Sequence, residues 1–175
     1  MSRFIDVARD AFEFLTRKYG FSFVECSGAN GGGHVTYVNT QHGVAVKAMY
    51  EVSSAFVFVF IYRLIDGELR ENSLPITDQS EINCIDFNDV LTEAQKMKPA
   101  YEYGDHSPFY DEQFGLRNFV REFAARLEGF GGPLLGGDFS VMAQVAVIIR
   151  RRAEALEAQK VIRGQRVRGK GSGLF

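Results

Sequence analysis

The sequence predicts a single α+β domain: an N-terminal helix, an antiparallel meander of four to five strands, and three helices packed on the sheet. Over residues 2 to 20, apolar side chains recur every three or four positions, as in an amphipathic helix. From residue 21 to residue 65 the apolar period is two, in segments separated by polar turns. Helical spacing returns in the second half of the chain, which therefore places more helices after the sheet.

The first helix is predicted from its caps as well as from its period. Ser2 can cap the start, and Gly20 stands where a left-handed C-terminal cap is needed. The apolar positions are Phe4, Ile5, Ala8, Phe12, Leu15 and Tyr19.

Four strands are predicted over residues 21–26, 34–39, 44–51 and 55–65, joined by short turns and therefore antiparallel. The strand at 44–51 alternates as a half-buried strand does. The strand at 55–65 is apolar on both faces, which predicts a strand covered on both sides. One of its faces is aromatic and carries Phe56, Phe58, Phe60 and Tyr62.

The polar interval 66–81 is open to two interpretations, a short fifth strand or a long loop. Asp86 or Asn88 then caps a short helix through Lys96. A second helix opens at Ser107 and Pro108 and ends at Gly129, and Asp138 caps a last helix through about Lys160. The domain is expected to cover residues 1–163, followed by a flexible basic tail at 164–175.

Composition predicts a cytoplasmic protein with an aromatic-rich core. Hydrophobic residues make up 46% of the chain, including 16 Phe. Cys26 and Cys84 lack metal or redox spacing and are expected to be reduced, buried thiols. The N-terminus does not have the pattern of a signal peptide, and the most apolar helical stretch, residues 141–149, is too short to span a membrane.

The glycine-rich stretch at 28–33 raises the question of a nucleotide cofactor. Gly31 and Gly33 begin a dinucleotide-binding pattern, but position 36 is Thr36 and a strand follows instead of a helix. His34 and Val35 stand where a P-loop needs lysine and a hydroxyl residue. We therefore interpret the stretch as a hairpin loop and expect no cofactor.

Neither a metal site nor a catalytic site is predicted. His34 and His42 fall at opposite ends of one strand and cannot share a zinc ion. Cys84 lies in an apolar segment, which makes a thiol inert. The loop at 101–106 contains two carboxylates, an imidazole and two phenols, which are groups that binding sites use. Its candidate contact residues are Tyr101, Glu102, Asp105 and His106.

The charge is strongly asymmetric. Residues 1–149 carry 12 Lys and Arg against 20 Asp and Glu, a net −8, whereas residues 150–175 carry 8 against 2, a net +6. Glycine-interspersed arginines occur in proteins that bind single strands, but the acidic body would oppose a polyanion, so nucleic acid is an unlikely partner.

The segments FEFLTRKYGF, VTYVN, VAVKAMYEVSSAFVFVFIYRLIDGE and IDFNDVL together resemble a group of small bacterial α+β proteins, some of them similar to immunity proteins of toxin systems. The resemblance covers about residues 4–92 and carries over no catalytic position. It implies a cytoplasmic protein that binds and blocks a toxin.

The sequence therefore leaves two alternative functions. The first is a non-enzymatic, immunity-like binding protein that meets a basic protein partner, such as a toxin domain, through an acidic surface. The alternative is a small-molecule binder or enzyme with a pocket between the aromatic sheet face, including Phe58 and Tyr62, and the helices.

Overall fold

The computed structural model describes residues 3–28, 32–51, 56–97 and 115–169, with side chains described as far as residue 160. Within these residues the helices are α1 (Arg3–Ala11), α2 (Glu13–Tyr19), α3 (Phe87–Asp89), the π-helical turn η1 (Val90–Ala94), α4 (Gly115–Phe130), α5 (Gly132–Leu135) and α6 (Ser140–Gly169). The strands are β1 (Ser22–Ser27), β2 (Gly33–Asn39), β3 (Val44–Glu51), β4 (Phe56–Arg63) and β5 (Cys84–Asp86).

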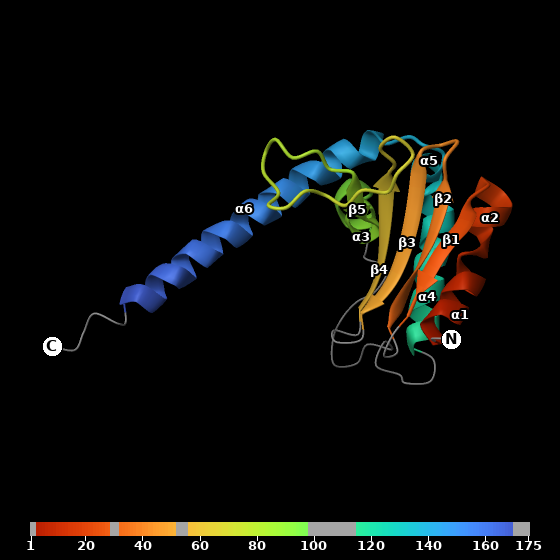
Figure 1. Ribbon diagram of the computed structural model, residues 1–175, viewed down its shortest axis with the longest axis horizontal. Helices are drawn as coiled ribbons and strands as arrows, with labels where there is room; N and C mark the ends of the chain where they lie inside the picture. Colours follow the sequence, from red (N-terminus) through yellow and green to blue (C-terminus); the bar gives the residue numbers. More distant parts are fainter. Residues whose placement is uncertain (1–2, 29–31, 52–55, 98–114, 170–175) are drawn as a thin grey trace.

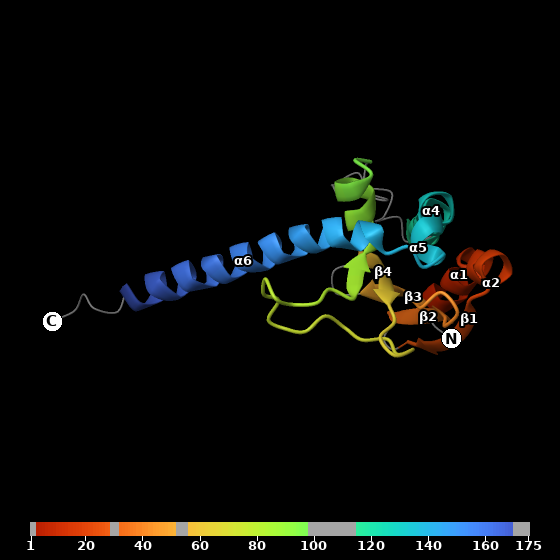
Figure 2. The same cartoon turned by 90° about the horizontal axis from the view of Figure 1, so that it is seen from above.

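The predicted α+β architecture is confirmed. All five strands form one sheet in the order β1-β2-β3-β4-β5, and every neighbouring pair is antiparallel. Figure 1 shows this sheet in the body of the molecule. In Figure 2, α1, α2, α4 and α5 lie on one side of the sheet and the segment between β4 and β5 lies on the other.

The N-terminal helix is broken in two at Phe12. This residue leaves helical geometry (φ −94°, ψ 9°), and its side chain is completely buried. The apolar spacing continues unchanged across the break, so the sequence predicted one helix. Gly20 caps α2 with a φ of 68°, as predicted.

Strands β1 and β2, which flank the glycine-rich stretch, pair antiparallel, which agrees with the interpretation of the stretch as a turn, although residues 29–31 lie outside the described residues. Gly33 has a steric reason to be glycine, because a Cβ atom there would lie 2.4 Å from the carbonyl oxygen of Ser27.

The helices cover the aliphatic face of the sheet, not the aromatic face. Val57, Val59 and Ile61 of β4 are completely buried in the core that α1, α4 and α6 share with the sheet. Tyr62 lies in a second cluster on the opposite face. The predicted placement of the aromatic face against the helices is therefore wrong.

The register of β3 and β4 gives the physical reason. Ile61 pairs with Val46 and Val59 pairs with Ala48, so the two aliphatic faces coincide. The aromatic face of β4 instead continues onto Lys47, which pairs with Phe60. Helices cover the face that is apolar on both strands because burying Lys47 beneath them would be costly.

Two predicted helix caps are confirmed. The Asp86 carboxylate accepts a hydrogen bond from the backbone N of Asn88 at 2.9 Å, and the Asp138 carboxylate accepts one from Ser140 N at 2.9 Å. The predicted start of α4 at Ser107 lies outside the described residues. The single turn α5 was not predicted.

Helix α6 runs to Gly169, past the expected end near Lys160. Residues 164–169 therefore have a helical backbone where a flexible tail was expected, and residues 170–175 lie outside the described residues. Arg, Gln and Val continue a helix, and Gly164 alone does not end it. Figures 1 and 2 show α6 extending away from the body.

Candidate functional site

Of the predicted site residues, the structure describes Phe58 and Tyr62. The Phe58 ring is half-buried and stacks on Phe60 with 5.7 Å between centroids and an angle of 11° between the ring planes. Tyr62 is buried, and its hydroxyl donates a hydrogen bond to Glu71 Oε1 at 2.8 Å. The other four predicted residues, Tyr101, Glu102, Asp105 and His106, lie outside the described residues.

The sequence left open whether residues 66–81 form a short fifth strand or a long loop. In the structure, residues 64–83 connect β4 to β5 as one long loop. A single isolated bridge, between Ile65 and Glu68, is the only strand-like pairing described in it. Loops of this length without secondary structure are uncommon in compact domains and are often functional.

Asn72 fixes the middle of this loop to β5. Its side-chain amide donates to the carbonyl oxygen of Cys84 at 2.7 Å, and its Oδ1 accepts from the backbone N of Asn83 at 2.8 Å and of Cys84 at 2.9 Å. One side chain thus satisfies three backbone groups beside the edge of the sheet. No sequence spacing distinguishes this asparagine from others in polar loops.

The second half of the loop is held from α6. Arg150 Nη2 donates to the carbonyl oxygen of Ser80 at 2.9 Å. Ser80 also closes a local turn, because its hydroxyl accepts from the backbone N of Thr77 at 2.9 Å. Ile76 packs against the main core. The loop is therefore fixed at several points and does not depend on strand pairing.

The first half of the loop lies over the aromatic side of the sheet. Leu69 packs with Phe60 against the cluster around Tyr62, and Glu71 lies 3.8 Å from Lys47 Nζ. Together, this half of the loop and the adjacent sheet surface form what we call the acidic face. Its carboxylates are Glu25, Glu51, Asp66, Glu68 and Glu71; its basic side chains are Lys47 and Arg70; and its aromatic pair is Phe58 and Phe60.

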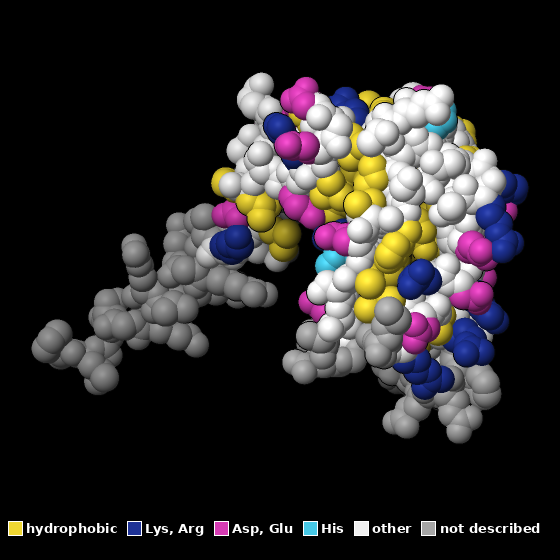
Figure 3. Space-filling model, turned by 45° about the vertical axis from the view of Figure 1, so that its right-hand side comes forward, with side chains coloured by type: hydrophobic (Ala, Val, Ile, Leu, Met, Phe, Trp, Pro, Cys, Tyr) yellow, Lys and Arg dark blue, Asp and Glu magenta, His cyan; other side chains and the backbone are white. Residues whose placement is uncertain are grey.

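The acidic face carries five carboxylates and two basic side chains. Arg70 lies 3.2 Å from Glu68 and 3.8 Å from Asp66, and all three side chains are exposed. Exposed pairs of this kind contribute little to stability. Because carboxylates outnumber basic side chains, the face has a formal excess of negative charge. Figure 3 shows hydrophobic side chains that reach the surface of the body beside charged ones.

Cys84, beneath the loop, has the properties expected of an inert thiol. Burial raises its pKa to about 12, and the same cause raises the pKa of the adjacent Tyr62 hydroxyl. The thiol is therefore protonated at neutral pH and is not a nucleophile. Cys26 is half-buried, so only Cys84 matches the predicted burial fully, and both cysteines are free thiols.

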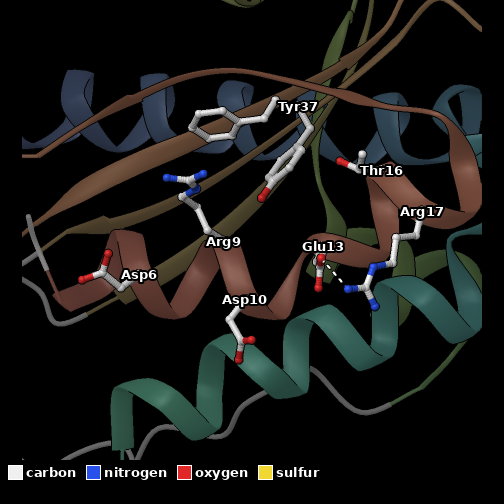
Figure 4. A pocket seen from close by; sticks show the side chains of 8 residues that line it. Asp6, Arg9, Asp10, Glu13, Thr16, Arg17 and Tyr37 are labelled. Carbon is white, nitrogen blue, oxygen red and sulfur yellow. Dashed lines mark hydrogen bonds and ion pairs between the residues drawn. The ribbon is translucent and has the colours of Figure 1, made fainter.

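A concavity of about 480 Å³ lies between the N-terminal helices and β1 (Figure 4). Arg9 and the Tyr37 hydroxyl point into it, and burial raises the pKa of Tyr37 to about 12. Arg9 lies over the Phe23 ring, 4.8 Å from its centroid. Charged side chains make up most of the lining, whereas small-molecule sites are mainly apolar. The groove therefore differs from the small-molecule pocket expected from the sequence.

His34 lies near the start of β2 and His42 lies in the turn after this strand, as predicted, and His34 Nε2 lies 3.3 Å from Glu25 Oε1. Within the described ranges, no three His, Cys, Asp or Glu side chains come together in a way that could hold a metal ion. In the same part of the chain, no helix is long and apolar enough to cross a bilayer. No family model, curated protein or solved structure matches this sequence.

Proposed function

We propose that this protein is a non-enzymatic binding protein that meets a basic protein partner through the acidic face. The observation that supports this most strongly is the aromatic pair Phe58 and Phe60, which lies with Lys47 and Glu71 on the side of the sheet away from the described helices. The resemblance to immunity proteins supports a cationic toxin domain as the partner.

The layout of the acidic face suits a protein interface. Interfaces combine a central group of aromatic residues with a polar rim, and the aromatic residues contribute most of the binding energy. Negative charge at the rim accelerates encounter with a basic surface and orients it. Because Asn72 already holds the loop in place, binding costs little ordering of the loop.

Two observations favour binding over catalysis. Cys84 is protonated and buried, so it does not supply a nucleophile. The functional residues of the acidic face are exposed carboxylates and half-buried rings, which suit complementarity with another surface. The alternative was a small-molecule pocket between the aromatic sheet face and the helices, and the part of it that rests on Tyr101, Glu102, Asp105 and His106 lies outside the described residues and stays a prediction.

The proposal can be tested by affinity capture from native lysate with charge-matched variants. In D66N/E68K the acidic face gains three positive charges; asparagine is chosen for Asp66 because this residue has a φ of 55°, which asparagine tolerates. D6N/E154K makes the same charge change at exposed positions on α1 and α6 and serves as the control.

We expect wild type and the control to retain the same basic protein and D66N/E68K to lose it. With the purified partner, the association rate of D66N/E68K should fall by about tenfold or more at low salt, and F58A should mainly accelerate dissociation. Equal capture by D66N/E68K and wild type, or a retained partner that is acidic, would refute the proposal.

A further inference from the structure

A buried tyrosine ends in the concavity between the N-terminal helices and β1. Tyr37 is only 3% exposed, and its ring packs in the main core, edge-on to the Phe23 ring with 5.6 Å between centroids. Its hydroxyl points into the concavity (Figure 4), and among the described residues it has no hydrogen-bond partner. The hydroxyl of a buried tyrosine is usually hydrogen-bonded, so this one is available to a ligand.

Arg9 brings an unpaired positive charge to the same space. Its guanidinium points into the concavity and lies 4.8 Å from the centroid of the Phe23 ring. Within the part of the chain that the structure describes, Arg9 forms no ion pair, although Glu13 is only four positions away. A guanidinium binds a carboxylate through two parallel hydrogen bonds. Arg9 and Tyr37 therefore offer hydrogen-bond donors to an oxyanion.

The Tyr37 hydroxyl is a donor at neutral pH. Burial raises its pKa to about 12, while the charge of Arg9 opposes this rise and that of Glu13 adds to it. Both charges therefore lie within electrostatic reach of the hydroxyl, a positive one that attracts an anion and a negative one that attracts a cation. Arg17 contacts Glu13 Oε1 at 2.6 Å, which leaves the second oxygen of this carboxylate to another donor.

The charge of the lining limits the class of ligand. Three carboxylates and two arginines line the concavity, so the carboxylates repel a ligand with negative charge alone, such as phosphate. A ligand that carries both charges finds an opposite charge for each. The volume of about 480 Å³ is within the range of small-molecule sites, and a charged lining suits a charged ligand.

We propose that this concavity binds a free amino acid in its zwitterionic form. The carboxylate accepts hydrogen bonds from the Arg9 guanidinium and the Tyr37 hydroxyl, and the ammonium group donates to Glu13. In an α-amino acid a single carbon joins the two ionic groups, which matches a lining in which Arg9, Glu13 and Tyr37 converge (Figure 4). In a peptide these groups lie at opposite ends of the chain, so a peptide does not present both here.

Nuclear magnetic resonance of protein that carries isotope-labelled tyrosine rings tests this proposal. The signal of Tyr37 is the one that disappears in Y37F. Each proteinogenic amino acid is added separately at about 10 mM, which nearly fills a site with a Kd of about 1 mM. We expect at least one of them to shift the Tyr37 signal until the shift saturates. If none does, the proposal is wrong.

Two derivatives of the amino acid that binds test the recognition of both charges. The N-acetylated form has lost the ammonium group, and the amide of the carboxyl group has lost the carboxylate. Each should bind at least about tenfold more weakly in calorimetric titrations, because each has lost a charge-assisted hydrogen bond. An N-acetylated form that binds as tightly as the free amino acid would show that the site recognises a carboxylate alone, and a zwitterion would then be the wrong ligand.

Two variants place the ligand in the concavity. Y37F should weaken binding by about fivefold or more and R9Q by about tenfold or more, because each removes a donor to the carboxylate. R151Q is the matched control, since it makes the same charge change as R9Q at an exposed position of α6 outside the concavity.

Both variants should keep the wild-type circular dichroism spectrum and melt within about a degree or two of wild type, because Arg9 is exposed and the Tyr37 hydroxyl has no described partner. D66N/E68K should bind the amino acid as wild type does, because the acidic face lies on the other side of the sheet. Wild-type affinity in both Y37F and R9Q would place the ligand elsewhere and refute the proposal.

Discussion

Replacing Asn72 with alanine should release the long loop from β5. The substitution removes three hydrogen bonds of 2.7, 2.8 and 2.9 Å and leaves backbone groups of Asn83 and Cys84 without their partner, although both residues are more than nine-tenths buried. Since water can replace part of what is lost, we expect a cost of about 2 to 4 kcal/mol. For a domain of this size the melting temperature should fall by about 5 to 15 °C.

Two measurements and two further variants make this test specific. Hydrogen exchange should show lost protection at the Cys84 amide, which donates to Asn72 Oδ1. N72D keeps the two acceptor contacts but loses the donor, so its melting temperature should lie between those of wild type and N72A. N118A, at an exposed position of α4, should change stability by less than about 0.5 kcal/mol. If N72A melts within a degree or so of wild type and Cys84 stays protected, the anchoring role is wrong.

Three further predictions concern buried groups and the hairpin. Burial raises the pKa of Asp86 to about 6, so the folded state binds this proton more tightly than the unfolded chain, and wild-type stability should fall as the pH rises from about 4 to 6. D86N keeps the helix cap and should flatten this dependence in urea titrations. A thiol reagent should label native Cys84 far more slowly than native Cys26, and equal rates would contradict the burial. G33A should lower the melting temperature by several degrees because its Cβ atom would contact Ser27 O, and an unchanged value would show that the hairpin can shift.

The strands of the meander were predictable because alternation and turn residues are local signals. The predicted strand at 44–51 matches β3 at both ends, and 34–39 matches β2 within one residue. The cap by Asp86 was predictable for the same reason, since its carboxylate bonds to a backbone N only two residues away.

Which face of β4 meets the helices was not predictable from β4 alone. This strand is apolar on both sides, so its own pattern favours neither face. The deciding residue is Lys47 on β3, whose pairing with Phe60 marks the aromatic face as the one that reaches solvent. A prediction that had first set the register between the two strands would have placed the helices correctly.

The anchoring of the long loop was also beyond the sequence. Asn72 contacts residues 11 and 12 positions away, and Arg150 contacts Ser80 from 70 positions away. Such contacts depend on the folded arrangement of β5 and α6, and no local period encodes them. Of the proposed acidic face, the sequence identified Phe58 but not the carboxylates of the long loop.

The acidic face depends on the anchor at Asn72 as well as on its own carboxylates. Asn72 lies at the boundary between the half of the loop over the sheet, with Asp66 and Glu68, and the half beside α6, with Leu74. N72A should therefore weaken partner binding, because the half of the loop that carries Asp66 and Glu68 is then no longer held in place. Partner binding by N72A that equals that of wild type would show that the acidic face does not depend on the anchored loop.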